Sequence, residues 1–299
     1  EYLAKTLQGL EGVLADELRA LGAKDIQVQR RAVSFKGDKK CLYKANFWLR
    51  TALRILKPVA TFQVKSPDDV YTAIKKLKLE EFITADKTFS IDTTVYSETI
   101  NHSRYVTYKA KDAIVDYFSE KYGKRPSVSV ANPDIYFNLH ISHTTCTLSL
   151  DSSGAPLFKR GYRVAQTEAP INEVLAAGLL MLSGWKGQCD FIEPMCGSGT
   201  IAIEAAMIAL NMAPGLFRKE FAFERWADFD RDMFDEIYND DSLEIEFKHK
   251  IYASDVSAKA IGIANANIKS AGLGRYIETK VMDIAEMPVQ EKPIHSVFN

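Results

Sequence analysis

The sequence predicts an α/β fold for its rear half, preceded by two smaller α+β modules. Residues 189–192 are typical of a short buried strand, and Pro194 ends it because proline cannot donate to a strand ladder. Gly197 and Gly199 then predict a tight turn. Residues 201–212 have the alanine-rich, apolar periodicity of a buried helix. A strand, an acidic residue, a glycine turn and a helix open a nucleotide-binding βαβ unit.

The first module covers residues 1–62 and has the order β-α-β-β-α-β, which is typical of a ferredoxin-like fold. Its first helix is predicted by five leucine and valine residues on one face and ends at Gly22. Residues 25–29 and 32–36 alternate as a strand pair. A second helix is expected over 39–49.

The second module covers residues 63–160. Ser66-Pro67 predicts a helix start, and residues 135–141 and 146–150 alternate as a hairpin with one buried face. His140 and His143 resemble a metal-binding pair in spacing. Residues three apart on a strand point to opposite faces, so we reject a metal site there and expect none elsewhere.

Composition is that of an ordinary globular protein, with 46% hydrophobic and 26% charged residues. There is no apolar run long enough to cross a bilayer, so no membrane contact is expected. The four cysteines lack CxxC spacing, which predicts reduced thiols and a cytoplasmic location. Net charge is −1, but residues 1–165 hold 26 Lys/Arg against 18 Asp/Glu, whereas residues 166–299 hold 12 against 21. This division favours a basic front that meets a polyanion, with ordinary surface variation as the alternative.

The glycine turn also narrows the class of ligand that we expect at this site. The third glycine of the dinucleotide fingerprint is missing, and no Lys-Ser/Thr pair follows to grip phosphates. We therefore expect a nucleoside without a pyrophosphate.

Glu193-Pro-Met-Cys-Gly-Ser-Gly-Thr200 resembles the first motif of the class I S-adenosylmethionine-dependent methyltransferases, which have a Rossmann-like fold. It is most similar to the branch that methylates exocyclic amines of nucleic-acid bases, although that branch usually has aspartate where this chain has Glu193. The front half resembles the THUMP-containing RNA-modifying enzymes through three segments: Gly9-Leu10-Glu11, residues 46–56 and Gly161-Tyr162-Arg163. These resemblances imply a methyltransferase domain over residues 165–299.

The resemblance also implies the residues that bind S-adenosylmethionine. They are Glu193, Met195, Cys196, Gly197, Gly199, Asp255 and Asp283. Asp255 ends a predicted strand over 251–255, where a carboxylate can accept both hydroxyls of a ribose. The alternative is that Asp255 caps the next helix, and Asp283 is also a common turn residue.

Asn299 stands where the amino-methylating branch begins its Asn/Asp-Pro-Pro-aromatic motif, and the resemblance makes it the catalytic residue. The alternative is an asparagine that only satisfies a turn. A doubly wound sheet stopped here would leave an apolar edge uncovered, so we expect the sequence to end inside the catalytic domain.

The resemblance implies methylation of the exocyclic amine of a guanine in large-subunit (23S) ribosomal RNA. The basic N-terminal modules would hold this structured RNA through phosphate and stacking contacts, unless their Lys and Arg are only a solvated face. Guanine methylation in transfer RNA and adenine methylation in DNA are alternatives. A more distant alternative is an RNA-binding protein without catalysis.

Overall fold

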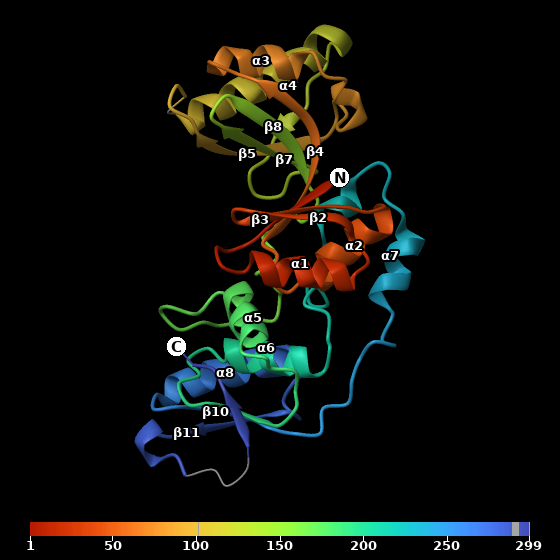
Figure 1. Ribbon diagram of the computed structural model, residues 1–299. Helices are drawn as coiled ribbons and strands as arrows, with labels where there is room; N and C mark the ends of the chain where they lie inside the picture. Colours follow the sequence, from red (N-terminus) through yellow and green to blue (C-terminus); the bar gives the residue numbers. More distant parts are fainter. Residues whose placement is uncertain (101, 289–292, 299) are drawn as a thin grey trace. The chain divides into compact units, whose positions relative to one another are not determined.

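The computed structural model describes residues 1–100, 102–288 and 293–298 (Figure 1). The chain forms two compact units that each combine distant segments. The first comprises Glu1–Leu3, Arg54–Ala155 and Glu220–Arg231. The second comprises Ala4–Leu53, Pro156–Lys219 and the described residues from Asp232 onward.

The first unit is a sheet with strand order β4-β8-β7-β5-β6, and α3 and α4 lie together on one of its faces (Figure 1). Its elements are β4 (Arg54–Gln63), α3 (Pro67–Lys75), η1 (Leu79–Glu81), β5 (Thr88–Tyr96), α4 (Ser103–Tyr122), β6 (Ser127–Val128), β7 (Ile135–Ser142), β8 (Thr145–Asp151) and η2 (Ala222–Arg225).

Local sequence explains much of this unit. Ser66 caps α3 and forms a capping box with Asp69, as the Ser-Pro pair predicts. β7 and β8 pair in antiparallel register so that Leu139 lies opposite Leu148, and both side chains are fully buried. The turn between them places His143 at φ 54°, in the left-handed region. The predicted hairpin is therefore confirmed.

The second unit begins with the remaining part of the ferredoxin-like segment. Its elements are β1 (Tyr2–Lys5, of which the last two residues belong to this unit), α1 (Glu11–Ala20), β2 (Lys24–Gln29), β3 (Ala32–Lys36) and α2 (Lys39–Trp48). They form the strand order β2-β3-β1. The buried carboxylate of Glu17 accepts hydrogen bonds from the backbone amides of Arg50 (2.7 Å) and Thr51 (3.0 Å), which fixes the end of this segment against α1.

A parallel four-stranded sheet forms the rest of the second unit, with strand order β11-β10-β9-β12. Its elements are α5 (Glu173–Leu182), β9 (Asp190–Glu193), α6 (Thr200–Ala209), α7 (Arg231–Tyr238), β10 (Ile251–Asp255), α8 (Ala258–Ser270), β11 (Ile277–Val281), η3 (Ile284–Glu286) and β12 (Ile294–Ser296). β9 pairs in parallel with both β10 and β12. The α/β fold predicted from the glycine turn is confirmed.

The helix before this sheet begins later than the sequence pattern predicts. Proline fits the first turn of a helix, so Pro170 predicts a helix that starts there, but α5 starts at Glu173. The reason is Asn172, whose side chain accepts hydrogen bonds from the amides of Val174 (2.9 Å) and Leu175 (3.3 Å) and caps the helix there.

Buried polar side chains join the ferredoxin-like segment to the sheet domain within this unit. Arg50 donates to the carbonyls of Met207 (3.4 Å) and Met212 (2.8 Å), around the end of α6. Arg160 donates to the carbonyl of Arg50 (2.6 Å) and pairs with Glu204 of α6 (3.4 Å). Leu10 also packs so closely on α5 that a Cβ at Gly178 would lie 2.5 Å from its Cδ1. These contacts hold the two segments together within the second unit.

Candidate cofactor site

The four-stranded sheet reverses its strand order beside β9. The chain runs outward from β9 to β10 and β11, and β12 then returns to the other side of β9. All four strands are parallel, so the segments after them lie along one edge of the sheet. Ligands of open α/β sheets bind at the carboxyl edge where the strand order reverses. The last residues of β9 and β10, the glycine turn after β9 and the segment after β11 carry the predicted cofactor residues.

The two glycines after β9 have different roles. Gly199 has φ 77°, and a Cβ there would lie 3.1 Å from the Cβ of Ala264, so this glycine lets α6 and α8 pack closely. Gly197 has φ 51°, and a Cβ there would meet only Thr167 Oγ1, at 3.9 Å. The backbone at Gly197 therefore borders open space, as close approach by a ligand requires.

Asp255 ties the ends of two neighbouring strands together. Its Oδ2 accepts a hydrogen bond from the amide of Gly197 (3.0 Å), and its Oδ1 accepts one from the amide of Ser257 (2.9 Å). The cap of α8 is Ser257, whose hydroxyl accepts from the amide of Ala260 (3.2 Å). Each oxygen of the half-buried carboxylate keeps a further lone pair. Asp255 can therefore accept two more hydrogen bonds from a diol.

Glu193 is buried too deeply to contact a ligand directly. It is 1% exposed, and its Oε2 accepts a hydrogen bond from the amide of Ala202 in the first turn of α6 (2.8 Å). Burial, together with the nearby charge of Asp255, raises the pKa of Glu193 well above its ordinary value of 4.5. In the structure, this hydrogen bond holds the start of α6 against β9.

The structure places the other predicted residues along the same edge. The amide of Met282 donates to the carbonyl of Asp255 (3.0 Å), which holds the end of β11 beside the end of β10. Asp283 follows it, is exposed, and accepts a hydrogen bond from the amide of Ala285 (2.9 Å). Met195 is 44% exposed, whereas Cys196 is buried. Asn299 lies outside the described residues.

Asn267 of α8 is a residue that sequence analysis missed. It is 1% exposed, and its Oδ1 accepts from the amides of Val164 (2.9 Å) and Ala165 (3.1 Å). Its Nδ2 donates to the carbonyls of Ala165 (2.9 Å) and Ser198 (2.9 Å). Asn267 thus holds the segment before α5 onto the glycine turn. The available signal was a polar residue on the buried face of an otherwise apolar helix.

Two further contacts fix the same segment. The hydroxyl of Ser198 accepts a hydrogen bond from the amide of Thr167 (2.9 Å). Arg163 pairs with Glu173 (2.8 Å) and donates to the hydroxyl of Thr200 (2.8 Å) at the start of α6. Its Nη1 is buried and has no hydrogen-bond partner among the described residues. The segment before α5 is therefore held against this edge of the sheet.

These groups fit a nucleoside cofactor such as S-adenosylmethionine. Asp255 offers two acceptor oxygens for a ribose, Gly197 leaves room beside its backbone, and the exposed Met195 supplies an apolar surface. Within residues 1–100, 102–288 and 293–298, no group of three or more His, Cys, Asp and Glu is arranged to hold a metal ion. In the same part of the chain, no helix is both long and apolar enough to cross a membrane.

The cysteines do not supply a nucleophile. Burial raises the pKa of Cys196 to about 12, and the pKa of Cys146 to about 12. Burial also raises the pKa values of Cys41 and Cys189. A thiol needs a lowered pKa to act as a thiolate near neutral pH. The site therefore suits the transfer of a group from the cofactor to a nucleophile that belongs to the substrate.

Three family descriptions match successive parts of the chain. Residues 1–56 match the RlmL ferredoxin-like domain, residues 64–151 the THUMP domain, and residues 160–298 the RMKL-like methyltransferase domain. A Synechocystis protein named as a candidate RNA methyltransferase is 36% identical over 292 residues, covering 96% of this chain and 75% of its own length.

Solved structures agree with these matches. SMU.472, a candidate methyltransferase crystallised with SAH, superposes with a TM-score of 0.88 and 30% identity, covering 100% of this chain and 79% of that one. A predicted N6-adenine-specific DNA methylase from Listeria monocytogenes gives a TM-score of 0.88 and 32% identity, covering 99% and 78%.

Proposed function

This chain belongs to the THUMP-containing family of S-adenosylmethionine-dependent methyltransferases, and we propose that it methylates the exocyclic amino group of a guanine in large-subunit ribosomal RNA. The observation that carries this proposal is the link between Asp255 and Gly197 at the edge where the strand order reverses. It places a diol acceptor beside a glycine that leaves room for a ligand. The RNA substrate is supported by the THUMP match and by the name of the Synechocystis relative.

In the proposed reaction, the cofactor supplies an electrophilic methyl group, and the chain's residues position it. Asp255 would accept hydrogen bonds from the ribose hydroxyls, and Asp283 would accept one from the adenine amino group. Glu193 acts indirectly, because its bond to the amide of Ala202 keeps α6 and the glycine turn in place. Asn267 and Arg163 hold the preceding segment over that turn.

The amine of a guanine is a weak nucleophile because its lone pair is delocalised into the ring. We assign its activation to Asn299, whose amide oxygen would accept a hydrogen bond from the amine while a backbone carbonyl accepts a second one. These two hydrogen bonds would direct the lone pair toward the methyl group without a strong base. As the new N–C bond forms and the S–C bond of the cofactor breaks, SAH would leave and the extra amine proton would pass to water. Positioning and exclusion of water supply most of the acceleration. The base has to leave its helix to reach such a site.

Adenine in DNA is the second candidate substrate, favoured by the name of the Listeria relative. A transfer assay with labelled cofactor separates the candidates. Unmodified large-subunit ribosomal RNA, transfer RNA and duplex DNA are each incubated with the protein at equal nucleotide concentration. We expect label in ribosomal RNA at least tenfold above the other two. Label mainly in transfer RNA or DNA would overturn the ribosomal assignment.

A further inference from the structure

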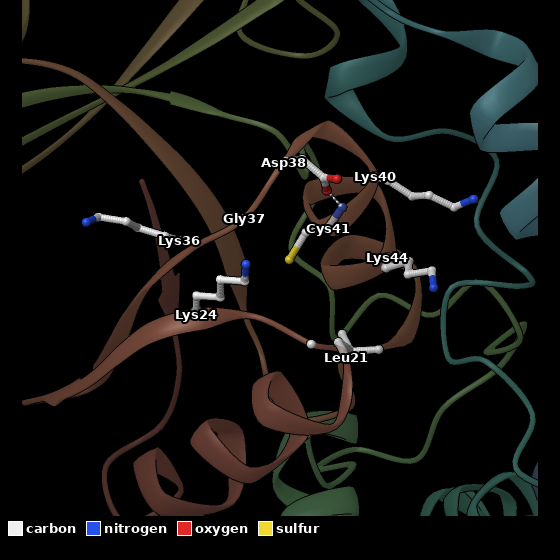
Figure 2. A pocket seen from close by; sticks show the side chains of 9 residues that line it. Leu21, Lys24, Lys36, Gly37, Asp38, Lys40, Cys41 and Lys44 are labelled. Carbon is white, nitrogen blue, oxygen red and sulfur yellow. Dashed lines mark hydrogen bonds between the residues drawn. The ribbon is translucent and has the colours of Figure 1, made fainter.

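The ferredoxin-like segment contains a cavity that shares no lining residue with the cofactor edge (Figure 2). It has a volume of about 510 Å³ and lies between the start of β2, the end of β3 and the first half of α2. Four lysines and one acid are the charged residues of its lining, which comprises Leu21, Gly22, Lys24, Lys36, Gly37, Asp38, Lys40, Cys41 and Lys44. The cavity is therefore strongly cationic.

The positions of these lysines bring like charges close together, which lowers local stability. Lys24 and Lys36 lie directly opposite each other in the β2–β3 register, where like charges destabilise a strand pair. Lys40 and Lys44 are one helical turn apart on α2, where like charges also repel. Figure 2 shows Lys40 and Lys44 extending from α2 in a similar direction, with Lys24 and Lys36 on the strands beyond Cys41. Such local conflicts concentrate where a protein binds a ligand.

Nearby acids compensate only part of this charge. Lys36 pairs with Asp25 (2.8 Å) and Lys40 with Glu236 (3.2 Å), and both pairs are solvent-exposed. The carboxylate of Asp38 is engaged with the amide of Cys41 (2.8 Å) as the cap of α2 (Figure 2). Hydrogen bonds from Ser242 lower the pKa of Asp240, and the nearby charges of Lys44 and Lys40 lower it further. Among the described residues, Lys24 and Lys44 form no ion pair.

The distribution of charge along the chain points to the same place. Residues 4–53 hold 10 Lys/Arg against five Asp/Glu, whereas residues 54–155 hold 13 against 12. Of the three basic residues between 156 and 165, Arg160 and Arg163 are engaged with Glu204 and Glu173. The positive excess of the front half therefore belongs mainly to the ferredoxin-like segment.

We propose that this lysine pocket is a docking site for the phosphate backbone of the RNA substrate. The inference rests on the proposed function, because it takes RNA as the polyanion. Lysine is a point-charge donor that suits phosphate without reading sequence. A polyanion also explains the pocket better than a single small anion, because the four lysines come from two strands and a helix and their side chains diverge (Figure 2). The pocket would fix the RNA on the same compact unit that carries the cofactor edge.

The test compares Lys24→Gln/Lys44→Gln with a control, Lys186→Gln/Lys269→Gln, which removes two exposed lysines from elsewhere on the same unit. Binding of ribosomal RNA fragments and of duplex DNA to the whole protein is measured from 50 to 300 mM salt, together with SAH affinity and melting temperature. For two lost phosphate contacts, the slope of log affinity against log salt should fall by about 1.4–1.8, with affinity about tenfold lower. The control variant should keep the wild-type salt slope and the wild-type affinity for RNA. SAH affinity should stay unchanged in every variant.

Each outcome has a distinct meaning. A pocket variant that folds and keeps the wild-type slope overturns the docking site, while RNA methylation by the wild type still supports the proposed function. A reduced slope in a protein that methylates no RNA supports the docking site and overturns the proposed function. Loss of duplex DNA binding with unchanged RNA binding overturns RNA as the occupant. Melting temperature should not fall in the pocket variant, because the Lys24–Lys36 repulsion is relieved.

Discussion

Replacing Asp255 with alanine should remove most of the affinity for the cofactor. The substitution deletes both acceptor oxygens proposed for the ribose and leaves the amides of Gly197 and Ser257 without their partner. A hydrogen bond to a charged group contributes about 1.5–3 kcal/mol. Two such bonds, reduced because the site is half open to water, give a loss of about 2–4 kcal/mol, or roughly 30-fold to 1,000-fold in Kd.

Isothermal titration calorimetry with SAH measures this loss, and thermal melting reports the stability of each variant. Ser257→Ala is the matched control, because it removes the cap of α8 at a stability cost of about 1 kcal/mol and leaves the carboxylate of Asp255 in place. We expect the control to melt earlier and to bind SAH normally. An Asp255→Ala protein that folds and binds SAH within threefold of the wild type would refute the assignment of Asp255.

Three other substitutions test the remaining parts of the site. Asn299→Ala should lower single-turnover methyl transfer by tenfold or more and leave SAH affinity nearly unchanged, because its contact is to the reacting amine; a normal rate in the folded variant would exclude it from catalysis. Glu193→Gln should flatten the dependence of melting temperature on pH: the raised pKa means that the folded state favours the protonated acid, so stability falls as pH rises above about 4.5 toward the folded value, and glutamine cannot ionise. If the wild type and Glu193→Gln show the same dependence of melting temperature on pH from pH 4 to 9, the carboxyl of Glu193 does not titrate as described. Asn267→Ala should cost about 2–4 kcal/mol in urea unfolding, since four buried hydrogen bonds are lost, and a cost below 1 kcal/mol would show that water replaces them.

The order of elements could be read from the sequence because it depends on local periodicity. Alternation in β7 and β8 and the glycine turn before α6 are short-range patterns, and the structure confirms both. Helix starts were less certain: Asn172 prevails over Pro170 because a side-chain cap satisfies two amides.

Contacts between segments far apart in the sequence could not be predicted from these local patterns. The division of charge at Ala165 suggested a separate basic front, yet residues 4–53 belong to the same compact unit as the methyltransferase sheet. The link runs through Arg50, which reaches carbonyls more than 150 positions along the chain. Asn267 was missed for the same reason, since its four partners lie near residues 165 and 198.

The glycine motif indicated the position of the site but not the role of each residue in it. Glu193 and Asp255 are both acids at strand ends, and only burial distinguishes them: Glu193 is 1% exposed, whereas Asp255 is half-buried at the edge. Gly197 and Gly199 likewise differ only in what surrounds them, since Ala264 of a later helix lies against Gly199 alone.

The identity of the methylated nucleoside tests the central claim most directly. Unmodified large-subunit ribosomal RNA is incubated with the protein and deuterated S-adenosylmethionine, digested to nucleosides and analysed by mass spectrometry. The proposed function predicts deuterated N2-methylguanosine approaching one per RNA molecule. Deuterated N6-methyladenosine, or no labelled nucleoside from a protein that binds SAH, would contradict it.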